Sequence, residues 1–359
     1  AEDGREALAR LRDREDPAAA EAALRAGPKL PQETREAIAL PLGRVQRLAA
    51  DADPARRRLA ALAYRDHPDA GAEVLAALAM DPAPEVRRAA AEALRALGPA
   101  AVPALAAVLD DRGAAPARRR RAARLLGSLT VQEAGETLLA RLNGADPEVL
   151  DSVLRALERQ RRRAPELRYP QDPVRRQVSR AARDYLETRV ALVCLAGTHG
   201  GAATGLLVRT LEARLDRIIQ GLFTVLGLRY PPRDMQAAWR AVRRGTPAER
   251  ANAAEFLDNI LDHELKRFVL PLLDEDRPPE QAGRELFGLK LDGPREALRA
   301  MLREGDPWLA ACASAAAAEL GFRDLAGEVR AAARRAGAAV AQVAEAALRA
   351  LEGAEQEKA

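Results

Sequence analysis

A helix–turn–helix segment of about thirty residues recurs along this chain and limits what it can fold into. The clearest copy runs from Asp81 through Gly98 as one helix and continues to Leu109 as a second helix. Segments of this size cannot bury their apolar faces alone and must stack on their neighbours. The repeat therefore predicts an all-α fold in which helix pairs stack into a right-handed α–α superhelix. The prolines that open the first helix of each segment, spaced by 30, 32 and 31 residues, are Pro54, Pro84, Pro116 and Pro147.

The local sequence of the clearest segment explains why it should be helical. Val86, Ala90 and Leu94 recur at helical spacing, so they lie on one face. Proline is favoured at the first residue of a helix, and Gly98 with Pro99 supplies a stop signal. These signals predict a short amphipathic helix followed by a turn.

The repeat divides the 359 residues into five segments. Within the middle segment, Tyr169-Pro170-Gln-Asp-Pro173 predicts a loop or linker over 161–180. No split into separate domains is required, because a repeat array grows by adding units. The five segments are N-terminal capping helices at 1–50, a regular array at 51–160, an irregular middle with longer helices at 161–245, a second array with a C-terminal cap at 246–352, and a frayed tail at 353–359.

Arginine dominates the basic residues, with lysine at only four positions, and the net charge is +4. Residues 112–183 hold 17 arginines against 8 acidic residues, so this part of the chain is strongly basic. Within it, two runs of arginine are candidates for a binding surface, and an exposed tryptophan further along could add to it. These candidates are Arg118, Arg119, Arg120, Arg121, Arg161, Arg162, Arg163 and Trp239.

Arginine pairs also recur three and four residues after the first three index prolines. Stacking the segments would align these pairs, which are Arg57/Arg58, Arg87/Arg88 and Arg119/Arg120. A guanidinium matches carboxylates and helix-terminal carbonyls, so the first two pairs are expected to form a structural ladder between neighbouring segments.

The chain offers little for catalysis or metal binding. Only two cysteines and three histidines occur, and none has the spacing of a metal site or of a nucleophile with its base. We therefore expect no catalytic residue, no metal and no cofactor, and the chain is not predicted to be an enzyme. Residues 190–208 are uncharged, but turn residues around Gly200 interrupt them, so no membrane span is expected.

The run from Asp81 to Gly98, followed by Ala-Val-Pro-Ala-Leu, resembles the HEAT repeat in the short form shared with phycobilisome-lyase-like proteins. This resemblance covers most of the chain. It implies an armadillo-like α-solenoid with antiparallel helix pairs and a concave inner surface, and it leaves the chemistry to particular surfaces.

The second half carries a narrower resemblance. The residues Leu228-Arg-Tyr-Pro-Pro232, Ala253 to Asp262, Leu270 to Leu273 and Asp306-Pro-Trp-Leu309 are similar to the soluble HEAT region of bacterial membrane proteins related to ATP/ADP translocases. That family joins HEAT repeats to a major-facilitator-like transport domain. The resemblance implies that this chain is the cytoplasmic section of such a protein.

Together these observations predict a non-catalytic scaffold that binds another protein, or an attached domain of the same polypeptide, through an extended concave surface. The predicted location is the cytoplasm, with membrane association only through a domain that this chain lacks. One alternative is a HEAT protein that binds nucleic acid through the basic region 112–183. Another is a phycobilisome-lyase-like chaperone for a tetrapyrrole-bearing protein.

Overall fold

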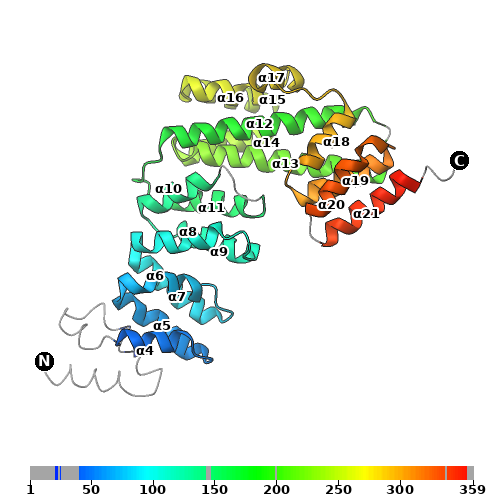
Figure 1. Cartoon of the computed structure of the whole chain (residues 1–359). Helices are drawn as coiled ribbons and strands as arrows, with labels where there is room; N and C mark the ends of the chain where they lie inside the picture. Colours follow the sequence, from blue (N-terminus) through cyan, green and yellow to red (C-terminus); the bar gives the residue numbers. More distant parts are fainter. Residues whose placement is uncertain are drawn as a thin grey trace, which may run out of the picture. The chain divides into compact units, whose positions relative to one another are not determined.

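The computed structural model describes residues 21, 22, 25, 40–142, 147–198, 200–335 and 338–353, and all regular secondary structure in these ranges is helical. The all-α prediction is thus confirmed, while most of the predicted capping segment 1–50 and the end of the predicted tail lie outside the described residues. The chain divides into two compact units, Ala1–Pro170 and Gln171–Ala359 (Figure 1). The sequence had not required such a division.

Unit 1 consists of short helices that alternate with tight turns. Each index proline is the first residue of a helix, as predicted, because its missing N–H needs no partner there. The helices are α4 (Leu42–Ala49), α5 (Pro54–Ala63), α6 (Pro68–Leu78), α7 (Pro84–Leu97), α8 (Val102–Asp110), α9 (Pro116–Leu126), α10 (Gln132–Arg141) and α11 (Pro147–Arg163), with 3-10 turns η2 (Tyr64–Asp66) and η3 (Gly98–Ala101).

The turn between α7 and α8 depends on Gly98, whose φ of 58° is disfavoured for residues other than glycine. Residues Pro84–Asp110 form the single stretch among the described residues that is long and apolar enough to be a candidate membrane span. Within it the chain bends at Gly98, and Val86, Leu94 and Leu105 are buried. The stretch is therefore a helix pair of the repeat.

The proline-opened helices of unit 1 pack in pairs. Helix α5 lies along α7, and α9 lies along α11, while α6 packs on α7 and α8 packs on α9. Small side chains dominate the contacts, with Ala89, Ala90, Ala122 and Ala123 all buried. Helices α7 and α9 do not form a comparable packed pair.

Unit 2 is built on two long antiparallel helices, α12 and α13. Helices α16, α17 and α18 pack against α12, while α14 and α19 pack against α13 (Figure 1). The helices are α12 (Gln171–Ala196), α13 (Ala202–Leu226), α14 (Pro232–Arg244), α15 (Pro247–Ile260), α16 (His263–Leu273), α17 (Pro279–Phe287), α18 (Pro294–Arg303), α19 (Pro307–Glu319), α20 (Ala326–Arg335) and α21 (Ala338–Gly353), with a 3-10 turn η5 (Arg323–Leu325).

The start of α12 corrects one prediction. The expected loop over 161–180 is wrong at both ends, because α11 continues to Arg163 and α12 begins at Gln171. Pro173 is the third residue of α12, where the first turn has no intrahelical N–H bond to lose. The proline that suggested a loop therefore lies inside a helix.

The start of α13 depends on a residue far along the chain. Glu319 of α19 accepts hydrogen bonds from the backbone N–H of Ala203 (3.1 Å) and Thr204 (2.8 Å) and from the Thr204 hydroxyl. These bonds hold the pKa of Glu319 below its ordinary value. The carboxylate thus supplies the cap that glycine-rich residues before α13 cannot provide.

Candidate functional site

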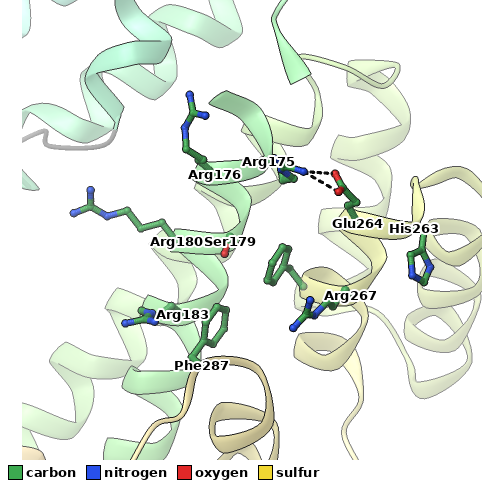
Figure 2. Close-up of a pocket in the computed structure, with 10 residues that line it drawn as sticks. Arg175, Arg176, Ser179, Arg180, Arg183, His263, Glu264, Arg267 and Phe287 are labelled. Atoms are coloured by element: carbon green, nitrogen blue, oxygen red, sulfur yellow. Dashed lines mark hydrogen bonds and ion pairs between the residues drawn. The ribbon is translucent and has the colours of Figure 1, made fainter. Parts of the chain in front are cut away.

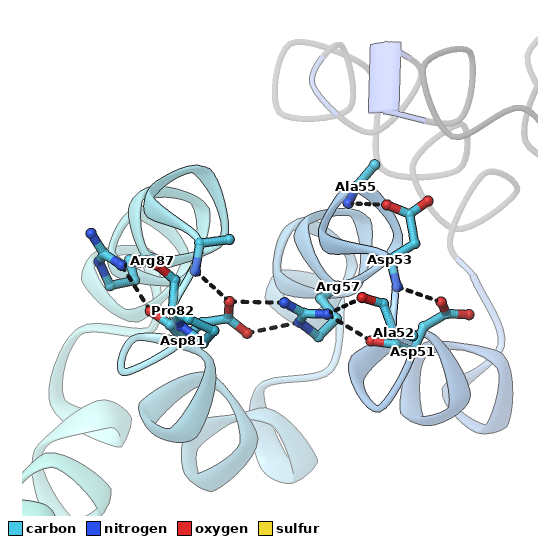
Figure 3. Close-up of polar contacts among 9 residues, drawn as sticks. Asp51, Ala52, Asp53, Ala55, Arg57, Asp81, Pro82 and Arg87 are labelled. Carbon is cyan, nitrogen blue, oxygen red and sulfur yellow. Dashed lines mark hydrogen bonds and ion pairs between the residues drawn. The ribbon is translucent and has the colours of Figure 1, made fainter.

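Of the predicted arginine ladder, the described part of the chain contains one contact between the first two repeats, which Arg57 makes (Figure 3). Arg57 donates from Nε and Nη2 to both carboxylate oxygens of Asp81, at 2.8 and 3.0 Å, and from Nη1 to the carbonyls of Asp51 and Ala52. Asp81 also accepts a bond from the Ala83 N–H at 2.8 Å. One guanidinium therefore joins the loop before α5 to the loop before α7.

A similar arrangement, which was not predicted from the sequence, recurs in unit 2. Arg250, three residues after Pro247, donates from Nη1 to the Gly245 carbonyl at 2.6 Å and pairs with Glu275. Two other ladder candidates do not bind an aspartate of the next repeat. Arg58 pairs with Glu21, and Arg88 is exposed.

We expect Asp81→Ala to lower the free energy of unfolding by about 2 kcal/mol, because both partners are largely buried and Arg57 would lose its acceptor. The Arg57 hydrogen bond holds the pKa of Asp81 below its ordinary value of 3.8. A lowered folded-state pKa means that the stabilisation is complete above pH 3.8 and is lost as the pH falls through the folded value. Urea unfolding at several pH values measures both effects.

The exposed Arg88→Ala variant provides the control and should unfold as the wild type does. The difference between wild type and Asp81→Ala should also shrink below pH 3.8. A difference that stays constant across this pH range would contradict the assigned ion pair.

The first run of predicted binding arginines does not form one surface. Four consecutive helical residues point in directions about 100° apart. In α9, Arg118 is exposed and Arg120 is half-buried, whereas Arg119 is only 6% exposed and donates to the Leu109 carbonyl at 3.0 Å. Arg121 is half-buried, with its Nε enclosed. Arg119 is thus a structural residue, which corrects its place among the surface candidates.

The remaining candidates are also dispersed. Arg161 donates to the carbonyls of Pro165 and Leu167, so it holds the chain that leaves α11. Arg162 pairs with Glu158, and Arg163 is exposed. Trp239 is half-buried, with the Arg243 guanidinium 5.8 Å from its ring centre. Contrary to prediction, this tryptophan is not an open aromatic surface.

A different cluster of arginines lines a cavity of about 610 Å³ within unit 2, between α12, α16 and α17 (Figure 2). We call it the α12 pocket. Five arginines and one carboxylate belong to its lining, so the cavity is positively charged. The lining residues are Arg175, Arg176, Ser179, Arg180 and Arg183 from α12, His263, Glu264, Arg267 and Phe268 from α16, and Phe287 from α17.

The arginines of the α12 pocket differ in how they are held. Arg175 turns towards Glu264 and donates to both of its carboxylate oxygens, at 2.6 and 2.7 Å (Figure 2). The side chains of Arg176, Arg180 and Arg183 extend from one side of α12. Within the described part of the chain, Arg176 and Arg180 form no hydrogen bond or ion pair. Two guanidiniums therefore remain available to an external anion.

Two phenylalanines form the apolar part of the pocket. The rings of Phe268 and Phe287 stack with centres 6.0 Å apart and planes inclined by 12°. The Arg183 guanidinium lies 5.2 Å from the Phe287 ring centre, and that of Arg267 lies 5.8 Å from Phe268. These contacts hold both cations beside an aromatic surface.

Asp172 of α12 pairs with Arg175 at 3.3 Å, whereas two later acidic residues of this helix, Asp184 and Glu187, are half-buried and do not line the pocket. Burial is the largest influence on Asp184 and Glu187 and raises the pKa of each carboxyl above its ordinary value. The positive charges of Arg180 and Arg214 act in the opposite direction on Asp184. Neither carboxylate forms an ion pair with Arg176 or Arg180 among the described residues.

This pocket could not be predicted from the sequence, because its main helix begins inside the predicted linker. Arg176, Arg180 and Arg183 are spaced by four and three residues, which is a helical stripe once α12 is recognised. The two phenylalanines come from helices far along the chain, and no local pattern connects them to α12.

The groups considered for catalysis do not converge in the described residues. No set of three or more His, Cys, Asp or Glu side chains there could hold a metal ion. Cys312 is buried, which raises the pKa of its thiol, and Cys194 contacts the Leu291 carbonyl at 3.8 Å. His199, the one histidine near Cys194 in sequence, lies outside the described residues.

Comparison with known proteins finds no matching protein-family model and no matching curated protein.

Proposed function

We propose that this chain is a non-catalytic scaffold of the HEAT-repeat type and that its α12 pocket binds an acidic segment of another protein or of an attached domain. The observation that carries the proposal is the composition of the pocket. Arg176 and Arg180, unpaired among the described residues, line the same cavity as Arg183, Phe268 and Phe287, while Glu264 is paired with Arg175.

The spacing of the arginines supports an extended acidic segment. Residues four apart in a helix are separated by about 6 Å along its axis. Side chains on one face of an extended chain repeat at about 6.8 Å. Acidic residues at alternate positions could therefore meet Arg176 and Arg180 in turn, while an apolar side chain contacts the phenylalanine pair. Such guanidinium–carboxylate bonds give the segment its orientation.

The HEAT assignment and the right-handed superhelix belong to the same proposal. The proline-opened helices, the packing of α5 on α7 and of α9 on α11, and the Arg57–Asp81 bond support them. We also propose a bacterial, cytoplasmic protein, associated with a membrane through a transport domain like that of the translocase-related family. This part rests only on the resemblance of the second half.

Fluorescence anisotropy with a labelled peptide of alternating glutamate and phenylalanine tests the pocket. We expect the Arg180→Glu/Arg183→Glu variant to bind at least about tenfold more weakly, because attraction becomes repulsion at two positions. Arg233→Glu, at an exposed position of α14, is the matched control and should bind like the wild type. Equal affinity of all three proteins would overturn the proposal.

Single-stranded DNA with the same net charge as the peptide tests the main alternative, which is nucleic-acid binding. Aromatic rings beside arginines can also stack on bases, so the pocket has features that a nucleic acid could use. Tighter binding of the DNA than of the peptide, with a steep loss of affinity in salt, would replace the peptide proposal by the nucleic-acid alternative. The tetrapyrrole-chaperone alternative stays a prediction.

A further inference from the structure

The predicted series of arginine–aspartate contacts between neighbouring repeats stops after the Arg57–Asp81 pair in the described chain. Asp51 and Asp81 stand three residues before their index prolines, and the corresponding Asp111 stands five residues before Pro116. Asp111 still accepts a bond from the Gly113 N–H, as Asp51 does from Asp53 and Asp81 from Ala83. The two extra residues therefore lie between an intact aspartate turn and the helix that follows it.

With this insertion, Arg87 has no carboxylate partner among the described residues. Like Arg57, it donates from Nη1 to the carbonyls of its own loop, those of Asp81 and Pro82 (Figure 3). In Arg57 the Nε and Nη2 groups bind Asp81, whereas the same groups of Arg87 have no acceptor within the described part of the chain. Asp111, the aspartate that would complete the second rung, is exposed and forms no ion pair there.

The helices that the missing contact would join are also not packed along each other. Helix α5 packs along α7 and α9 along α11, but α7 and α9 form no comparable pair. The Nε of Arg121 in α9 is enclosed and has no hydrogen-bond acceptor among the described residues. Burial and the positive charges of Arg87 and Arg124 lower the pKa of Arg121, so its charged neighbours are cations.

We propose that Arg87 and Arg121, at the junction of α7 and α9, bind an external oxyanion in place of the missing aspartate. The ligand is a carboxylate or phosphate group that accepts paired hydrogen bonds from a guanidinium, as Asp81 does from Arg57. Such a group also offsets the repulsion between two neighbouring cations. The source is either a free anion or an acidic side chain of a bound protein.

Calorimetric titration of the full chain with inorganic phosphate at constant ionic strength tests the site. The titration uses the Arg180→Glu/Arg183→Glu background, so that the α12 pocket does not contribute and the two proposals fail independently. We expect millimolar binding that weakens at least about tenfold in Arg121→Gln. Arg118→Gln, an exposed arginine of the same helix, should leave the affinity unchanged.

Deleting Ala114 and Ala115, which lie between the Asp111 turn and Pro116, supplies a second test. The deletion restores the spacing of 30 residues and places Asp111 three residues before Pro116. The Asp111 carboxylate should then pair with Arg87, raise the melting temperature and abolish phosphate binding. Arg121→Gln keeps the proposal testable if this deletion variant does not fold.

The source of the oxyanion follows from a parallel titration with a glutamate-rich peptide. Phosphate binding that needs Arg121 identifies a free-anion site, and peptide binding alone that needs Arg121 identifies a partner's carboxylate. Binding of neither probe, or binding that survives Arg121→Gln undiminished, would overturn the inference.

Discussion

Replacement of Gln160 by leucine is expected to lower the free energy of unfolding by about 3 kcal/mol, because it removes hydrogen bonds to two buried polar groups and one partly buried polar group. Gln160 is fully buried in α11 and donates from Nε2 to the carbonyls of Leu129 (2.8 Å) and Val131 (3.1 Å). Its Oε1 accepts from the Tyr169 hydroxyl at 3.0 Å. Urea unfolding of the full chain measures the loss.

The position of Gln160 explains the size of the expected loss in the free energy of unfolding. Its side chain connects the turn between α9 and α10 with the chain that leaves α11, so one amide holds two irregular segments. Tyr169 is enclosed in the same place, and burial raises its pKa to about 12. Leucine fills a similar volume, and the expected loss therefore comes from hydrogen bonding rather than from a cavity.

Gln177→Leu is the matched control for this prediction. Gln177 is also buried, but its Oε1 has no hydrogen-bond partner among the described residues. Removing an unsatisfied amide should leave stability unchanged or increase it. Equal losses in Gln160→Leu and Gln177→Leu would show that the three bonds are not the cause.

Gly127→Ala is expected to cost about 3 kcal/mol through overpacking. A Cβ built on Gly127 would lie 2.6 Å from the Cα, Cβ and carbonyl oxygen of Ala156 in α11. Real Cβ atoms do not approach backbone so closely, so α9 and α11 would have to separate. The same urea unfolding experiment measures the effect.

Gly43→Ala tests whether the loss belongs to the position and not to glycine replacement in general. No atom lies within 4 Å of the corresponding Cβ on α4, and alanine favours helix more than glycine does. This variant should unfold at equal or slightly higher urea concentration. A wild-type stability for Gly127→Ala would show that α9 and α11 adapt without strain.

For several site residues, the kind of hydrogen-bond partner could be predicted from the sequence, but not which residue provides it. The arginines after Pro54 and Pro84 were expected to bind carboxylates or carbonyls, and Arg57 does so. For Arg119 the same sequence position leads to the Leu109 carbonyl instead, because the turn before α9 is two residues longer. A spacing of 32 in place of 30 was visible in the sequence, but its effect on packing was not.

What the sequence determined by itself is local. Prolines at first helical positions, apolar residues at helical spacing and glycine after α7 act within a few residues, so they predict helix pairs without knowledge of the fold. The tertiary structure decided which faces meet. The α12 pocket joins three helices distant in sequence, and the same holds for the Glu319 cap of α13, since such contacts depend on packing that no short-range pattern encodes.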